Sequence, residues 1–221
     1  MNAFDRIKAQ YLRDHPCTTD LIISYGSSAT LAAQIVQGSP ADVFVAASQS
    51  AMNTVTNAGL NVGPAVLFAR NKGEIMVSNA STYPVSTVAD LFQSGIRTGL
   101  CVASAPCGSL ANTILANART FHGNANISRA NIASEAASVE DLVTKIELGE
   151  FDAGIVYHSD CAYEVPKRLG FCVTIPDNVN SSNAYLVAAV SGSARAREFA
   201  DHVASASFTS MIRSVYGFLA P

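Results

Sequence analysis

Short apolar runs rich in β-branched residues alternate with helical patterns along nearly the whole chain of 221 residues. Several helical patterns end at a glycine, as at Gly38 and Gly59, and glycine is a common helix stop. Strands that alternate with helices form parallel sheets with helices on both faces. The pattern therefore predicts an α/β fold with mainly parallel sheets. The expected strands cover residues 21–24, 42–47, 65–68, 74–77, 98–102, 153–156, 171–175 and 185–190, and the expected helices cover 30–36, 51–58, 109–118, 139–148 and the chain from 194 onward.

The composition is that of a folded chain, rich in hydrophobic residues and poor in charged ones. Hydrophobic residues make up 49% and charged residues 14%, against about 25% charged residues in an average soluble protein. This balance excludes a disordered chain, and no apolar run approaches the roughly 20 residues that span a bilayer. The formal net charge is −3 and Lys and Arg are scattered, whereas nucleic acid needs a concentrated basic face. We therefore expect no nucleic-acid partner and no membrane span.

The five cysteines allow two interpretations. The pairs Cys101/Cys107 and Cys161/Cys172 are close enough in sequence to bridge, and Cys17 is left over. Neither pair has the C-x-x-C spacing of a zinc or thioredoxin site. Disulfides in an oxidising compartment and small buried thiols both remain open at this point.

The first residues do not form a secretory signal. Residues 1–8 lack the basic start, apolar stretch and small-residue cleavage site of such a signal. They form instead an amphipathic helical pattern, with Phe4, Ile7, Tyr11 and Leu12 on one face.

Three segments carry a strand, a turn and then a helix start, which is where ligands bind in open parallel sheets. In the first, Ser27 and Ser28 follow the expected strand at 21–24. A helix start offers unpaired N–H groups and a partial positive charge to an anion. A serine there also serves as a simple helix cap, and both readings remain open.

The second segment, at 99–110, contains Cys107, and the third, at 154–161, contains Tyr157. Small residues around Cys107 and Gly108 let backbone N–H groups approach a ligand closely, and the Tyr157 hydroxyl is a neutral donor. Catalysis by Cys107 needs a base, and none of the histidines lies in a recognisable motif. Enzyme motifs such as G-x-S-x-G and G-x-x-x-x-G-K are absent from the sequence. We therefore expect a binding protein without a cofactor, not an enzyme.

The same segments resemble the molybdate/tungstate-binding ModA proteins of ABC importers. SYGSSATLAAQI at 24–35, followed by GSPADVF at 38–44, is similar to the family pattern S-x-A-S-S-x-x-L-A-x-Q-I-x-x-G-x-P-A-D-V-F. Further matches, in order, are FARNK at 68–72, APCG at 105–108, GIVY at 154–157 and YGF at 216–218.

The resemblance implies a two-lobed type II periplasmic-binding-protein fold that closes by a hinge on an anion in the cleft between the lobes. Lobe 1 would comprise residues 1–69 and 184–221, and lobe 2 residues 70–183. Molybdate or tungstate would be bound through Ser28, Cys107, Val139 and Tyr157, with Ser27 and Gly108 as further candidates. Molybdenum would be held only as this oxyanion, with no residue coordinating the metal. A membrane permease would be the partner, and the chain would act as a monomer in the periplasm or on the extracellular face.

The chain departs from the family at its front, where the family has a strand and a loop with another serine ligand. The resemblance therefore implies that the first strand of lobe 1 is missing. We expect a truncated sequence here; the alternative is a natural variant that has dispensed with the strand. Appending the upstream coding sequence is then expected to raise melting temperature and affinity. Alternatives are a receptor for sulfate or another small oxyanion, and a sensor or adhesin module on the same fold.

Overall fold

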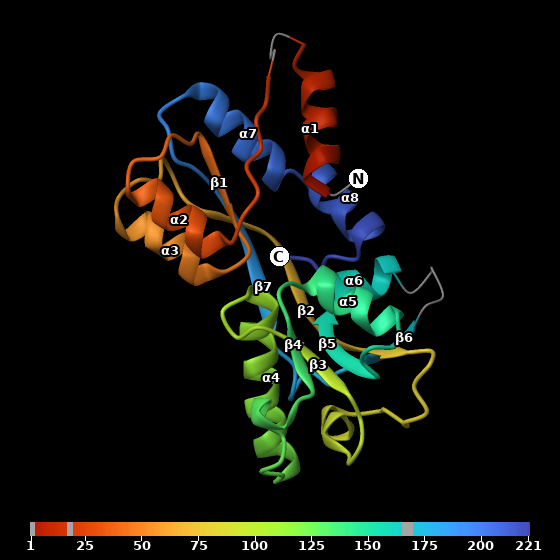
Figure 1. Ribbon diagram of the computed structural model, residues 1–221. Helices are drawn as coiled ribbons and strands as arrows, with labels where there is room; N and C mark the ends of the chain where they lie inside the picture. The colour runs from red at the N-terminus through yellow and green to blue at the C-terminus, as the bar shows by residue number, and fades with distance from the viewer. Residues whose placement is uncertain (1–2, 17–19, 165–169) are drawn as a thin grey trace. The chain divides into compact units, whose positions relative to one another are not determined.

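A computed structural model describes residues 3–16, 20–164 and 170–221 of the chain (Figure 1). The chain forms two compact units. Unit 1 consists of Met1–Arg70 and Ala184–Pro221, and unit 2 of Asn71–Asn183. Two long strands, β2 (Val66–Ser78) and β7 (Ser182–Ala189), each contribute residues to both units.

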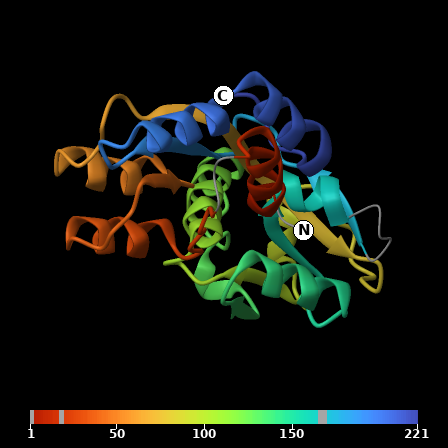
Figure 2. The ribbon, with the colours of Figure 1, turned by 90° about the horizontal axis from the view of Figure 1, so that it is seen from above.

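Unit 1 is built from helices around a short strand pair. Strand β1 (Val43–Ala46) pairs antiparallel with β7, with Val43 opposite Ala189. Figure 2 shows α2 and α3 lying side by side, and they share an apolar cluster with β1 that includes Phe44 and Met52. The helices of this unit are α1 (Ala3–Asp14), α2 (Ser28–Val36), α3 (Gln49–Asn57), α7 (Ala194–Ala204) and α8 (Ala206–Tyr216).

The amphipathic pattern at the front of the chain forms α1, as predicted. Ile7 and Tyr11 are buried, and they join a cluster with α7 and α8 that includes Phe199 and Phe208. The Tyr11 ring packs edge-on against Phe199, and its hydroxyl donates to Glu198 at 3.2 Å. The helix is therefore held by its apolar face, as its sequence period requires.

The strand predicted at residues 21–24 is wrong. The structure has no regular element there, and Ile22 is 82% exposed. An extended segment becomes a strand only when a neighbouring strand takes up its backbone N–H and C=O groups. Among the described residues, the pairing of β1 is with β7 and not with this segment.

Unit 2 contains a sheet in the order β6-β2-β5-β3-β4. Strand β3 runs parallel to both β4 and β5, whereas β2 runs antiparallel to β5 and β6. The α/β class is thus confirmed with a mixed sheet, not a mainly parallel one. Strand β2 enters from unit 1, so no crossover helix within unit 2 sets its direction. The remaining elements of the unit are η1 (Val88–Phe92), β3 (Thr98–Cys101), α4 (Pro106–His122), η2 (Arg129–Asn131), β4 (Ser134–Ala136), α5 (Val139–Glu147), β5 (Ala153–Tyr157), α6 (His158–Glu164) and β6 (Gly170–Thr174).

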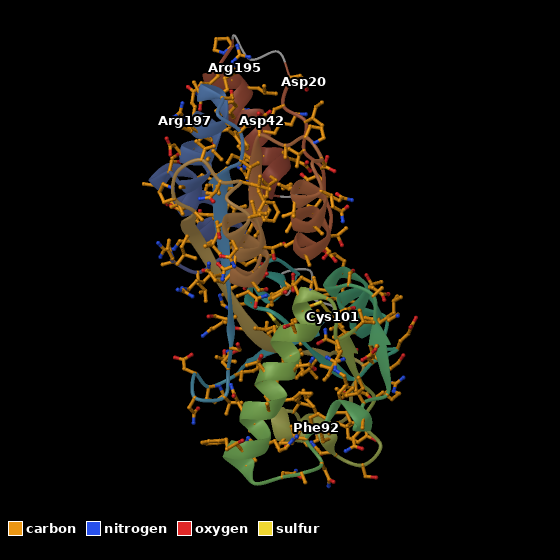
Figure 3. The ribbon with its side chains drawn as sticks, turned by 90° about the vertical axis from the view of Figure 1, so that its left-hand side faces the viewer. Asp20, Asp42, Phe92, Cys101, Arg195 and Arg197 are labelled. Atoms are coloured by element: carbon orange, nitrogen blue, oxygen red, sulfur yellow. A yellow bond between two sulfur atoms is a disulfide. The ribbon has the colours of Figure 1, made fainter. Side chains whose placement is uncertain are left out.

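Helix α4 covers the core of unit 2 along its length. Its residues Leu110, Ile114 and Leu115 are buried against the sheet residues Ile75 and Leu100. In Figure 3, Cys101 lies beside the first turn of α4 and Phe92 beside its far end. The helix therefore begins next to the point where β3 ends.

An ion pair joins the residues that precede strands β3 and β5, at the end of β3 away from the first turn of α4. Arg97 directly precedes β3, and Asp152 directly precedes β5. The Asp152 carboxylate accepts the Arg97 backbone N–H at 2.8 Å and two guanidinium N–H groups at 3.1 and 2.9 Å. Burial acts to raise the pKa of Asp152, but the hydrogen bonds from Arg97 outweigh it and lower the pKa.

Replacing Asp152 by alanine should cost about 2 kcal/mol of unfolding free energy, because it leaves the backbone and guanidinium donors of Arg97 without their acceptor. Urea denaturation of the variant checks this value. The matched control is Asp177→Ala, whose carboxylate is 94% exposed and 3.6 Å from Lys72, and which should cost less than about 0.5 kcal/mol. Equal losses for the two variants would contradict the role of the Arg97–Asp152 pair.

Burial disfavours the charged form of one histidine of unit 1. His202 on α7 packs against the Tyr11 ring, and its Nε2 is buried with no hydrogen-bond partner among the described residues. Burial lowers the pKa of His202; Asp14 opposes the shift and His15 adds to it. Protonation therefore opposes folding at this site.

Stability should fall as the pH drops below about 6.5, because the unfolded chain then binds a proton at His202 that the folded chain resists. Thermal unfolding at pH 7.5 and 5.5 measures the effect. His202→Gln should reduce the difference between the two melting temperatures, whereas His122→Gln, at an exposed position on α4, should leave it unchanged. An unchanged difference in the His202 variant would exclude this residue as the cause.

Candidate functional site

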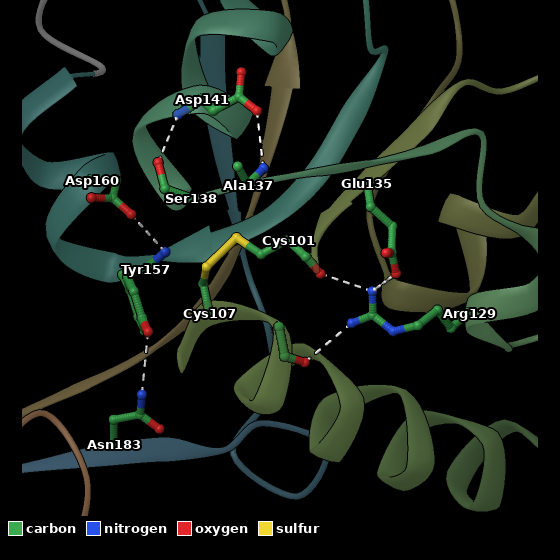
Figure 4. The surroundings of a disulfide bond; sticks show 11 residues. Cys101, Cys107, Arg129, Glu135, Ala137, Ser138, Asp141, Tyr157, Asp160 and Asn183 are labelled. Carbon is green, nitrogen blue, oxygen red and sulfur yellow. Dashed lines mark hydrogen bonds and ion pairs between the residues drawn. A yellow bond between two sulfur atoms is a disulfide. The ribbon is translucent and has the colours of Figure 1, made fainter. Parts of the chain in front are cut away.

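Three helices of unit 2 begin where three strands end. Strands β5, β3 and β4 are neighbours and run parallel, so their carboxyl ends lie at one edge of the sheet. Helices α4, α5 and α6 start directly after β3, β4 and β5. This edge brings together the predicted site residues Cys107, Gly108, Val139 and Tyr157. Figure 4 shows Cys107 and Tyr157 there, together with Ser138, which directly precedes Val139.

The first turn of α4 has two backbone N–H groups with no acceptor among the described residues. The first four N–H groups of a helix have no acceptor within it, and α4 has no side-chain cap at Ala105. Pro106 has no N–H to donate, and the N–H of Ser109 donates to Ala105 O at 2.9 Å. The N–H groups of Cys107 and Gly108 therefore remain at the positive end of the helix dipole.

Gly108 is required where α4 approaches β3. A Cβ built on Gly108 would lie 1.9 Å from the Val102 carbonyl oxygen, so no larger residue fits without moving the backbone. The close approach holds the first turn of α4 against the end of β3.

A disulfide reinforces the same turn. Cys101, the last residue of β3, is bonded to Cys107, with 5.8 Å between their Cα atoms. A second disulfide joins Cys161 on α6 to Cys172 on β6. The disulfide interpretation of both pairs is therefore confirmed, and Cys17 lies outside the described residues. Because the sulfur of Cys107 is bonded, no free thiol is present there to act as a nucleophile.

Helix α5 begins with a side-chain cap that does not bond the N–H group of the first helical residue. Ser138 Oγ accepts from the N–H of Asp141 at 3.3 Å, and Ser138 O accepts from the N–H of Leu142 at 3.1 Å. The N–H groups of Val139 and Glu140 therefore remain at the start of the helix.

The carboxylate of Asp141 stabilises this helix start. Its Oδ2 accepts from Lys145 Nζ at 2.9 Å and from the Ala137 N–H at 3.0 Å. These two bonds, that of Lys145 first, lower the pKa of Asp141. The carboxylate is thus engaged along the helix and in the preceding loop.

Tyr157 is held at the end of β5 by bonds at both of its ends. Its side chain is nearly buried, with an exposed fraction of 7%. The Tyr157 hydroxyl oxygen accepts from Asn183 Nδ2 at 3.2 Å, and the Tyr157 N–H donates to Asp160 at 2.9 Å (Figure 4). A phenol that accepts one hydrogen bond can also donate one.

Ser27 and Ser28 lie in unit 1, at the start of α2. Ser27 occupies the N-cap position, but its side chain makes no capping bond, so the reading of Ser27 as a simple cap is wrong. Ser28 is half-buried, and its Oγ accepts from the N–H of Ala47 at 3.0 Å. Accepting this bond directs the Ser28 hydroxyl proton away from Ala47.

One group of potential metal ligands lies in unit 2. Glu74, Cys161 and Cys172 have ligand atoms within 4.8 Å of one another, and Glu74 also contacts His158 Nδ1 at 2.6 Å. Both sulfurs are joined in the disulfide and are not thiolates, and thiolate is the form of cysteine that binds metals. This group therefore does not form a metal centre in the oxidised chain.

Several residues around the site were missed from the sequence. Ser138 and Asp141 form an S-x-x-D pattern before an apolar helix, which is a signal for a helix start. Arg129 and Asn183 carry no comparable signal, because their partners are distant in sequence or are backbone atoms.

The chain is similar to known proteins over nearly its whole length. Residues 1–219 match the family described as bacterial extracellular solute-binding protein. The molybdate-binding protein ModA of Mycobacterium tuberculosis (strain H37Rv) is 33% identical over 208 residues, which cover 93% of this chain and 76% of ModA.

Two solved structures share the fold of this chain. The periplasmic molybdate-binding protein of Azotobacter vinelandii superimposes with a TM-score of 0.79 at 20% identity, covering 99% of this chain and 94% of that chain. The sulfate-binding protein SubI of Mycobacterium tuberculosis H37Rv gives a TM-score of 0.78 at 15% identity, covering 98% and 82%. At these identities the likeness concerns the fold, which confirms the type II periplasmic-binding-protein prediction.

A family match over nearly the full chain and a relative at 33% identity lead to one conclusion. The chain belongs to the bacterial extracellular solute-binding protein family, where ModA is one of its relatives.

Proposed function

We propose that this chain binds molybdate or tungstate and delivers it to the membrane permease of an ABC importer. The observation that carries the proposal is the pair of backbone donors, Cys107 N–H and Gly108 N–H, at the start of α4. As a solute-binding protein the chain is a binding protein and not an enzyme. The 33% identity to the molybdate-binding protein ModA supports molybdate as the ligand.

Four residues are proposed to contact the anion. Cys107 and Val139 would donate backbone N–H groups, and Ser28 and Tyr157 would donate hydroxyls. Ser27 and Gly108 are further candidates on the same helix starts. We also propose that the two compact units are the two lobes of the fold, each supplying part of this set.

The proposed donors are uncharged, which favours an unprotonated dianion. Hydroxyls and N–H groups that are shielded from water can replace the hydration shell of molybdate. Phosphate carries a proton near neutral pH, and that proton needs an acceptor which a set of donors does not supply. Sulfate matches molybdate in charge and shape but is smaller, so it is the nearest alternative ligand, and the fold of SubI favours it as the second candidate.

The family supports a proposal for the site of action and the partner. Members are extracellular solute-binding proteins, and no described helix of this chain has the length and apolar character to cross a bilayer. We propose that the chain acts as a monomer outside the cytoplasm, with the permease as its partner and without nucleic acid.

Isothermal titration calorimetry with molybdate, tungstate, sulfate and phosphate tests the ligand assignment. Molybdate and tungstate should bind most tightly, sulfate more weakly and phosphate most weakly, for the reasons of charge, size and protonation given above. Sulfate binding as tight as that of molybdate would replace the ligand assignment by the sulfate alternative. The absence of binding for all four anions would refute the proposed function.

Removing either proposed hydroxyl should weaken the binding of molybdate. Ser28→Ala and Tyr157→Phe should each cost about 1–3 kcal/mol of binding free energy, which corresponds to roughly a 5- to 150-fold increase in Kd. The same calorimetric titration measures both variants.

The control for these variants is Ser205→Ala, which removes a serine that accepts the Phe208 N–H at the start of α8 in unit 1. It should cost about 1 kcal/mol of unfolding free energy and leave the Kd unchanged. If Ser28→Ala behaves like Ser205→Ala, then Ser28 does not contact the ligand.

A further inference from the structure

Arg129 lies next to the first turn of α4 and bonds to this helix through its guanidinium. It belongs to η2, between α4 and β4, far from the other site residues in sequence. Its guanidinium donates to the Cys101 carbonyl oxygen at 2.8 Å and to the Gly108 carbonyl oxygen at 3.2 Å (Figure 4). One planar group therefore joins the last residue of β3 to the first turn of α4.

Two further bonds fix the guanidinium itself. Arg129 Nε donates to Asn112 Oδ1 at 2.8 Å, one turn further along α4. Arg129 also pairs with Glu135 on β4, at 2.6 Å from the guanidinium to Oε1. The side chain of Arg129 is only 22% exposed. Arg129 is thus held by α4 and β4 and in turn holds the end of β3.

The two carbonyl partners identify what this contact does. Cys101 is the disulfide partner of Cys107, and Gly108 is the neighbour of Cys107, so one carbonyl belongs to the end of β3 and the other to the first turn of α4. The disulfide ties one side chain of the turn, but it does not set how the adjacent peptide groups point. A rigid fork of donors bound to both carbonyls holds the backbone of this turn against the end of β3.

We propose that Arg129 is a positioning residue for the anion site, which holds the first turn of α4, and with it the Cys107 and Gly108 N–H groups, in place against the end of β3 by binding the Cys101 and Gly108 carbonyl oxygens. The inference rests on the proposed function. Arg129 acts through geometry and not through net charge, because Glu135 neutralises its guanidinium.

Three variants test this role by calorimetry with molybdate. Arg129→Gln removes the planar guanidinium and should raise the Kd at least about tenfold. In metal sites, the loss of a residue that orients a ligand group weakens binding by about 10- to 100-fold, and tenfold is the lower end of that range. Arg129→Lys keeps the charge, but its ammonium has no planar fork to bind both carbonyls, so its Kd should also rise severalfold. Lysine restoring the wild-type Kd would show that charge alone matters and would overturn the positioning role.

Arg97→Gln is the matched control. Arg97 is also a guanidinium of unit 2 that bonds a carboxylate, but it lies at the opposite end of β3. Arg97→Gln should lower the melting temperature and leave the Kd unchanged. A Kd for Arg129→Gln within twofold of the wild type, or a loss of affinity in Arg97→Gln as large as that in Arg129→Gln, would overturn the inference.

The wild-type titration separates this inference from the proposed function. If the wild-type chain binds none of the four oxyanions, the proposed function fails and the inference fails with it. If the wild type binds and Arg129→Gln binds equally well, the inference alone fails. If sulfate binds most tightly, the same comparison is made with sulfate.

Discussion

The direction of three neighbouring strands determines where this molecule can present hydrogen-bond donors. Because β5, β3 and β4 run parallel, the helices that follow them must all begin at the same edge of the sheet. Each helix start carries N–H groups that the helix itself cannot satisfy. The sheet of unit 2 therefore gathers the starts of three helices at one edge.

The helix starts differ in how many donors they keep. Helices α3 and α8 begin at Ser48 and Ser205, whose side chains accept a backbone N–H. Helix α4 begins after Ala105 with no such cap, and α2 begins after Ser27, whose hydroxyl makes no capping bond. Helix α7 also begins uncapped, so a missing cap alone does not define a site. What distinguishes α4 is that Gly108, the disulfide and Arg129 all hold its uncapped turn in place.

Much of the fold could be predicted from the sequence, and so could the helix starts that carry the candidate site residues. The period of apolar residues predicted α1 and the alternation of strands and helices, since that period records which side faces the core. The strand predicted at 21–24 failed because pairing depends on a neighbour that an apolar run cannot reveal. The direction of β2 was missed for a similar reason, because the segment that precedes it lies in the other unit.

The contacts of Arg129 could not be predicted, because two of its four partners are backbone carbonyls and carry no side-chain signal in the sequence. The contrast with Arg97 shows why such contacts matter. Both guanidiniums pair with a carboxylate and both bind next to β3, but Arg97 does so where the strand begins and Arg129 where it ends. Of the two, Arg129 bonds to the first turn of α4, at the Gly108 carbonyl oxygen. The same chemistry therefore joins β3 to β5 at one end of β3 and, in our proposal, holds the donors of α4 in place at the other.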